Sequence, residues 1–263
     1  MKWIILSIFL IASCGKNPFD KSSTDAATQT FNSFPSVGAK TYFSQASTVT
    51  LEVYYEPGAT PFVGTTKFGK PYWGILEDNL KAIFQYRSMK PTLVVPKDLS
   101  AMTQLSAQNK TTWTIDDVLN LYEKNHQQNS TATNARFYIY FVNGYSSDSN
   151  SVIAFSINGT PIIAVFKNVI TSSGGEVVQK YVEQSTIVHE LGHALGLVNN
   201  GIPMTVPHQD TAHGNHTTNS DCVMYWMNEG KSDLMNFIIK YMSTGNNVMW
   251  GTEVLEDVRS FSK

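Results

Sequence analysis

The sequence predicts an α+β domain, in which strands with interspersed helices are followed by a helical C-terminal part. Three observations carry this prediction. Segments with the alternating, β-branched and aromatic pattern of strands are concentrated between residues 48 and 166. Two segments with apolar residues at helical spacing interrupt these strands. From residue 175 onward the pattern is helical, with one long helix and two shorter ones after it. Strands with interspersed helices, followed by a helical C-terminal part, are typical of this class.

The first 13 residues are typical of a secretion signal. Met1-Lys2 gives a positive start, and the apolar run at 3–12 is shorter than the roughly 20 residues that a membrane-spanning helix needs. Small residues stand directly before Cys14, which resembles the lipobox of bacterial lipoproteins. The resemblance implies a signal peptide at 1–13 and a lipid on Cys14 that anchors an extracytoplasmic protein to the cell envelope, at the outer membrane or cell surface. The alternative is an ordinary signal peptide followed by an incidental cysteine.

Residues 14–45 are rich in Ser, Thr, Ala and Asn, which predicts a flexible tether, and residues 46–263 are long enough for one domain. The net charge of −2 does not point to nucleic acid, and we expect a monomer. If Cys14 carries lipid, no second cysteine remains to form a disulfide with Cys222, so an internal disulfide and a cysteine-built zinc site are both excluded. We expect Cys222 to be a small buried residue.

The first half of the domain is expected to begin with a strand. Residues 48–55 alternate and end at Pro57-Gly58, which predicts a strand followed by a turn. Apolar residues at helical spacing across 72–87 predict a helix, and Pro91 closes it. Residues 93–95 then form a short strand candidate.

A second helix and three strands complete the predicted sheet. Thr114, with Asp117 three positions later, resembles a capping box and predicts a helix that continues to about Lys124. The strand-like segments that follow are 136–142, 152–157 and 162–166, the last two joined around Asn158-Gly159. The C-terminal helices are expected at 175–197, 232–242 and 252–261.

The long helix at 175–197 carries the most informative motif. His189 and His193 are four residues apart, so both imidazoles project from one helix face and can reach one metal ion. Glu190 lies beside the first histidine, where a carboxylate can take a proton from a water that the metal activates. The alternative is a helix with two buried, hydrogen-bonded histidines. Gly196, which can end the helix and turn the chain back, argues against that alternative.

His-Glu-x-x-His-x-x-Gly with a later methionine in a turn, here Met224-Tyr225, resembles the signature of the metzincin peptidases. The resemblance implies a metzincin-like mixed, twisted sheet with an active-site helix, a Met-turn and C-terminal helices, and Met224 in that turn would form a floor under the metal. The usual third ligand is a histidine three residues after the glycine, but Asn199 occupies that position. An amide is a poor zinc ligand beside imidazole, so the third ligand must come from later in the chain.

Three histidines precede the Met-turn, namely His208, His213 and His216. Archaemetzincins have a ligand His-Cys, four residues, and then Cys-x-Met. Here His216-Thr217 is followed by four residues and then Cys222-Val223-Met224. This resemblance favours His216 over His208 and His213. It also implies one catalytic Zn²⁺ only, because the first cysteine of the pattern is replaced.

The resemblance implies a zinc-dependent endopeptidase that acts on protein or peptide substrates. His189, His193 and His216 would hold zinc, and Glu190 would be the general base. The competing hypothesis is a catalytically degenerate surface lipoprotein that binds metal or mediates adhesion. Asn199 favours that alternative, whereas Glu190 argues against it because pure binding needs no general base.

Overall fold

The computed structural model describes residues 38–226 and 231–262. The elements, in chain order, are a π-helical turn (Thr41–Gln45), β1 (Thr48–Tyr55), α2 (Trp73–Phe84), β2 (Thr92–Val94), a 3₁₀ turn (Leu99–Ala101), β3 (Thr103–Gln104), β4 (Thr112–Trp113), α3 (Ile115–Asn125), β5 (Asn134–Val142), β6 (Tyr145–Ser146), β7 (Ala154–Ser156), β8 (Ile162–Phe166), α4 (Lys167–Thr171), α5 (Glu176–Leu195), α6 (Lys231–Thr244) and α7 (Thr252–Phe261).

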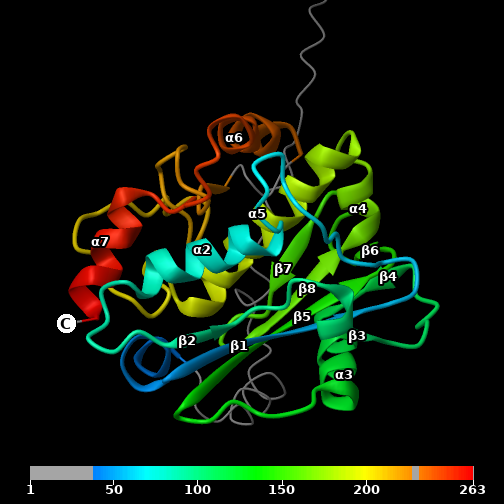
Figure 1. Cartoon of the computed structure of the whole chain (residues 1–263), viewed down its shortest axis with the longest axis horizontal. Coiled ribbons are helices and arrows are strands. Elements are labelled where there is room, and N and C mark those ends of the chain that lie inside the picture. The colour runs from blue at the N-terminus through cyan, green and yellow to red at the C-terminus, as the bar shows by residue number, and fades with distance from the viewer. Residues whose placement is uncertain (1–37, 227–230, 263) are drawn as a thin grey trace, which may run out of the picture.

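Six of the described strands form one sheet, in the order β2-β1-β5-β8-β7, with β3 beside β1. All neighbours are parallel except β7, which pairs antiparallel with β8. Helices α2 and α5 lie on one side of this sheet and α3 lies on the other, as Figure 1 shows. Helices α6 and α7 close the C-terminal part and pack against α5 and α2, respectively. The predicted α+β class with a mixed sheet and C-terminal helices is confirmed.

The predicted elements are present with small shifts at their ends. The capping box of α3 is formed, because the Asp117 N–H donates to Thr114 Oγ1 at 3.2 Å and the Thr114 N–H donates to Asp117 Oδ2 at 3.0 Å. The strand expected at 152–157 is shorter and spans only Ala154–Ser156. Gly159, in the turn to β8, has a φ of 71°, the left-handed conformation that favours glycine.

The two central strands separate apolar from polar side chains. β1 and β5 pair with Leu51 opposite Phe137 and Glu52 opposite Tyr138. Leu51 and Phe137 are buried in the core, on the same face as Phe141, whose ring lies 6.3 Å from that of Trp73 in α2. The strict alternation therefore places an apolar layer under the helices that carry the candidate site.

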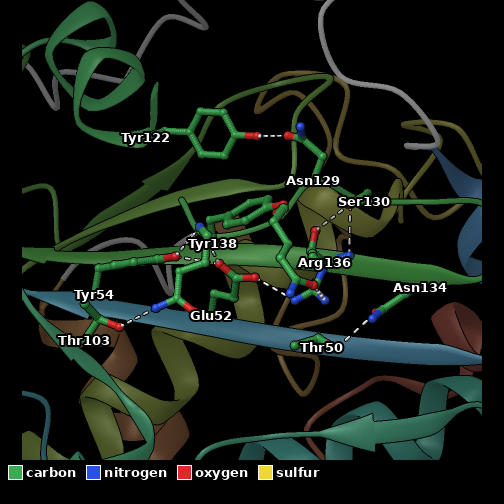
Figure 2. A network of polar contacts seen from close by, with 12 residues as sticks. Thr50, Glu52, Tyr54, Thr103, Tyr122, Asn129, Ser130, Asn134, Arg136 and Tyr138 are labelled. Carbon is green, nitrogen blue, oxygen red and sulfur yellow. Dashed lines mark hydrogen bonds and ion pairs between the residues drawn. The ribbon is translucent and has the colours of Figure 1, made fainter. Parts of the chain in front are cut away.

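The opposite face of the same strands carries the polar network drawn in Figure 2. Glu52 Oε1 lies 2.6 Å from Arg136 Nη1, and the Tyr54 hydroxyl donates to Glu52 Oε2 at 2.5 Å. The ring of Tyr138 meets the ring of Tyr122 in α3 edge to face at 4.8 Å. Helix α3 thus covers a face whose charged groups are paired with one another.

The packed domain begins earlier than the expected tether boundary at residue 45. Tyr42 and Phe43 are each only 1% exposed, and their rings pack against those of Phe137 and Phe84. The guanidinium of Arg87 donates to the carbonyl of Tyr42 at 3.0 Å. The burial of these aromatic side chains makes the end of the expected tether part of the folded domain. The polar composition of the tether segment did not indicate this.

The expected signal peptide at 1–13 and the lipidation site at Cys14 lie outside the described residues. Among the helices that the structure describes, none combines the length and the apolar character needed to cross a membrane.

The first half of α5 is held by a buried ion pair. Glu183, which is fully buried, pairs with Lys167 at the start of α4, and its Oε1 accepts the backbone N–H of Phe62 at 2.8 Å. The Lys167 ammonium lies 3.3 Å from the centre of the Phe62 ring. Burial raises the pKa of the Glu183 carboxyl to about 7 and lowers the pKa of Lys167. The pair fixes α5 against the segment that follows β1.

Candidate metal centre

Helix α5 presents two imidazoles on one face. His189 and His193 lie one turn apart near its C-terminal end, and their Nε2 atoms are 3.1 Å apart. His189 is buried and His193 is partly buried. The predicted pair is therefore formed by helix geometry alone, because residues four apart share a face.

Gly196 ends this helix and reverses the chain. Its φ of 86° is left-handed, and its N–H donates to the carbonyls of Gly192 and His193. A Cβ at this position would lie 2.7 Å from the carbonyl oxygen of Asn200. The N–H of Ile202 donates to the Gly196 carbonyl at 2.9 Å, so the loop doubles back over the helix end.

The loop that follows brings a third imidazole to the pair. His216 Nε2 lies 3.2 Å from His189 Nε2 and 3.2 Å from His193 Nε2. Isolated bridges pair Thr217 with Gln209 on one side and with Tyr225 on the other. These bridges give the loop a strand-like backbone, which holds the ring of His216 over the helix.

Two of the three rings place their Nδ1 atoms against backbone carbonyls. His189 Nδ1 lies 2.6 Å from the Val223 carbonyl oxygen, and His216 Nδ1 lies 2.6 Å from the His213 carbonyl oxygen. A carbonyl can only accept, so the proton of each neutral ring is on Nδ1 and the lone pair is on Nε2. Carbonyl partners of this kind are what orient metal-bound histidines.

The three histidines, His189, His193 and His216, form the one group of metal-binding side chains that converges among the described residues. Their Nε2 atoms are 3.1 to 3.2 Å apart. Tetrahedral Zn²⁺ with bonds of about 2.0–2.1 Å requires donor atoms roughly 3.3–3.4 Å apart. Three imidazole nitrogens are a ligand set that zinc takes in catalytic sites. The cluster therefore fits one zinc ion.

Glu190 follows His189 on α5, and its side chain is only 4% exposed. This buried carboxyl group neighbours His189 in the sequence, but it is not part of the converging group that the three histidines form.

The alternative histidines lie outside the cluster. His208 Nε2 is 2.7 Å from Asp257 Oδ2, and its Nδ1 is 3.1 Å from Thr217 Oγ1. His213 Nδ1 is 2.7 Å from Asp210 Oδ2, and its ring stacks on Trp226 at 3.8 Å. Of the three candidates in this loop, the structure brings only His216 to the pair on α5.

Asn199, which occupies the usual third-ligand position, turns away. Its amide donates to Gln209 Oε1 at 3.1 Å, and its φ of 61° belongs to the turn that follows α5. The expectation that Asn199 forms a turn is confirmed, because asparagine tolerates the left-handed conformation.

Met224 packs beneath the helix at Gly192. Met224 is fully buried, and a Cβ added to Gly192 would collide with its sulfur and lie 3.1 Å from its methyl carbon. The same Cβ would lie 3.2 Å from the ring of Trp250. Glycine between the two histidines of α5 thus lets the methionine turn and Trp250 approach the helix backbone.

Cys222, two residues before this methionine, is fully buried, as expected. Burial raises the pKa of its thiol to about 12, so the group stays protonated at neutral pH.

Sequence reasoning missed several groups that support the cluster. The carbonyl groups of Val223 and His213 orient two of the rings, and Asp257 of α7 pairs with His208. Backbone carbonyls leave no residue-type signal. The burial of Asp257 could have been suspected only from its place between apolar residues in the amphipathic pattern of α7.

No family model matches this chain, and no curated protein sequence matches it. Among solved structures, it is similar to an archaemetzincin from Methanopyrus kandleri, with a TM-score of 0.46 and 11% identity over 81% of this chain and 95% of that chain. It is also similar to a zinc-dependent peptidase from Methanocorpusculum labreanum, with a TM-score of 0.35 and 9% identity over 68% of this chain and 91% of that chain.

Proposed function

We propose that this protein is a zinc-dependent endopeptidase. The observation that carries the proposal is the convergence of the Nε2 atoms of His189, His193 and His216, 3.1 to 3.2 Å apart, next to the buried carboxyl group of Glu190. Zinc held by these imidazoles would supply a Lewis acid that polarises a peptide carbonyl and acidifies water.

Glu190 is the group that moves the proton. Its carboxylate accepts a proton from the attacking water as the new C–O bond forms at the scissile carbonyl. The same carboxyl then returns that proton to the departing nitrogen as the C–N bond breaks, so that one water is consumed for each peptide bond. The burial of Glu190 favours these two proton transfers, because bulk solvent has little access to the carboxyl group.

Strand β7 is the proposed binding edge for an extended substrate. It is the antiparallel strand at the end of the sheet, and it packs against α5. Its outer backbone groups can pair with a peptide in extended conformation, which aligns the peptide along the helix that carries the histidines. Phe155 and Ser156 of this strand are only half-buried.

The adhesion or metal-capture alternative keeps one sequence feature in its favour, the loss of the usual histidine at Asn199. The position of His216 removes that argument, because this ring completes the trio in place of the missing one. Glu190 further supports hydrolysis, since a site for binding alone needs no buried carboxylate beside the ligands.

The deciding experiment compares peptide hydrolysis by the wild-type chain before and after a chelator, and again after zinc is returned. Glu190→Ala should lose activity by orders of magnitude while elemental analysis still finds about one zinc per chain. Hydrolysis that survives in Glu190→Ala would refute the assigned role, and a wild-type chain that binds zinc without hydrolysing any peptide would favour the binding alternative.

We further propose that the protein is attached to the bacterial cell envelope by a lipid on Cys14. This proposal rests on the sequence around that cysteine, where small residues follow a short apolar run.

A further inference from the structure

We propose that Asn79 of α2 is a positioning residue for the metal ligand His189, and that it acts through a chain of three hydrogen bonds. The proposal rests on the proposed function in one respect, since it takes His189 to be a zinc ligand. Asn79 itself has no contact with the three histidines among the hydrogen bonds of the described residues.

The hydrogen-bond chain is continuous from the amide of Asn79 to the imidazole. The N–H of Met249 donates to Asn79 Oδ1 at 2.8 Å. The N–H of Val223 donates to the Met249 carbonyl at 2.8 Å, and the Val223 carbonyl lies 2.6 Å from His189 Nδ1. Met249 and Val223 each donate through their N–H and accept through their carbonyl, so the backbone of each residue is held at two points.

Asn79 holds the far end of this chain in place with every polar group of its side chain. It is completely buried, and its Nδ2 donates to the carbonyls of Ile75 at 2.9 Å and Asn247 at 2.6 Å. The indole N–H of Trp250 donates to the backbone carbonyl of Asn79 at 2.9 Å. Asn79 is therefore hydrogen-bonded to both ends of the segment 247–250.

That segment sets where Val223 lies. Met249 is completely buried, so its N–H loses its partner in the protein if the Asn79 amide is removed, and water cannot easily replace it. A shift of the segment that relieves this loss would move the carbonyl that accepts from Val223. The Val223 carbonyl in turn sets the angle and tautomer of the His189 ring.

A purely structural role would predict something different. Asn79 would then stabilise the contact between α2 and the C-terminal segment, and its loss would lower stability without any selective effect on His189. The neighbouring Leu80 provides the matched control, because it is also buried on α2 and its side chain has no polar group that could hydrogen-bond to segment 247–250.

The test uses the full chain and three variants. Asn79→Leu keeps similar volume but removes donors and acceptor, Asn79→Asp keeps Oδ1 as an acceptor, and Leu80→Ala opens a cavity on the same helix. Should Asn79→Leu not fold, Asn79→Ser replaces it, because its short side chain withdraws the acceptor without adding bulk. Zinc affinity is measured by competition with a chromophoric chelator, at a temperature at which every variant is folded.

We expect Asn79→Leu to weaken zinc binding about 3- to 10-fold, below the range for groups in direct contact with a ligand. Leu80→Ala should change the affinity less than about 2-fold at a similar loss of stability. Asn79→Asp should recover only part of the affinity, because Oδ1 can still accept from Met249 while the donors to the Ile75 and Asn247 carbonyls are lost. Equal affinity in Asn79→Leu and Leu80→Ala would overturn the proposal.

A second measurement needs no metal. In the metal-free protein, amide hydrogen exchange at Val223 and Met249 should be selectively faster in Asn79→Leu than in Leu80→Ala. The reason is that Asn79→Leu removes the first of the three hydrogen bonds. Unchanged relative protection of these two amides would also overturn the proposal. If the wild-type chain takes up no zinc at all, the proposed function fails on its own, and the exchange experiment still decides whether the chain of bonds exists.

Discussion

His208 and Asp257 form a buried pair that ties the loop carrying His216 to helix α7. His208 Nε2 lies 2.7 Å from Asp257 Oδ2. The two side chains are 7% and 2% exposed. Asp257 Oδ1 also accepts from the backbone N–H of Thr205 at 2.6 Å. The opposite nitrogen of His208 faces Thr217, the residue that follows His216. This pair supports the loop from outside the cluster.

The first prediction ranks the histidines of the loop. His216→Ala should lose zinc and activity together, because His189 and His193 alone leave two protein bonds where catalytic sites have three. His208→Ala should weaken zinc binding about 10- to 100-fold at most, as expected for a residue that acts through its neighbours. Asn199→Ala should leave zinc occupancy almost unchanged.

Zinc titrations of these three variants give the ranking directly. If His208→Ala loses the metal while His216→Ala retains it, the assignment of His216 is wrong.

The second prediction concerns Gly192. Alanine is the better helix former by about 1 kcal/mol, yet Gly192→Ala should lower the thermal stability because its methyl group collides with Met224 and crowds Trp250. Thermal unfolding followed by circular dichroism measures the change. The double variant Gly192→Ala/Met224→Ala should regain part of the thermal stability that Gly192→Ala loses, because the smaller residue at 224 leaves space for the new methyl group. A Gly192→Ala variant that is more stable than wild type would contradict the close approach.

The third prediction is a pH dependence of stability. Burial raises the pKa of Glu183 to about 7, above its ordinary value of 4.5, so the folded state binds this proton more tightly than the unfolded state does. The contribution of this carboxyl to stability is therefore present below about pH 4.5 and is lost as pH rises towards 7. The slope of this loss is at most about 1.4 kcal/mol per pH unit.

The matched variant is Glu183→Gln/Lys167→Met, which removes both charges of the buried pair. Urea unfolding at pH 5, 6 and 7 should show the wild type losing stability relative to this variant as pH rises. Parallel pH profiles for the two chains would show that Glu183 does not titrate in this range.

The fourth prediction concerns the envelope attachment. Cys14→Ser should release the protein from membranes into the soluble fraction, because the lipid on Cys14 would be the attachment. Cell fractionation followed by immunoblotting measures this change. Retention of the variant in the membrane fraction would point to an uncleaved signal segment or to a partner protein.

The sequence predicts the helix that carries the site because its signal is local. His189 and His193 share a face through the helix repeat, and Gly196 ends the helix through its own conformation. The strands were predictable for the same reason, since alternation in 48–55 and 136–142 follows the pleat.

The rest of the site depends on long-range contacts that leave no periodic pattern. His216 was favoured by resemblance alone, and its position follows from bonds such as the Thr217 N–H to the Met224 carbonyl at 2.9 Å. Asn79 lies in an amphipathic helix where a polar residue normally predicts a solvent-facing position, yet it is completely buried. Its partners lie in a segment far along the chain, so only the folded structure reveals them.

The division of β1 and β5 into an apolar and a charged face also selects one pairing of the chain. A slip of β1 by one residue against β5 would turn Glu52 towards α2 and α5, away from Arg136, and would bring Leu51 under α3. Burying a charge without its partner costs several kcal/mol. Pairings of β1 and β5 in a wrong register are thereby disfavoured during folding. β8 can then pair with β5 in a single register. α4 and α5 follow β8 along the chain. The charged face of β1 and β5 therefore helps to set the position of the α5 histidines relative to the sheet.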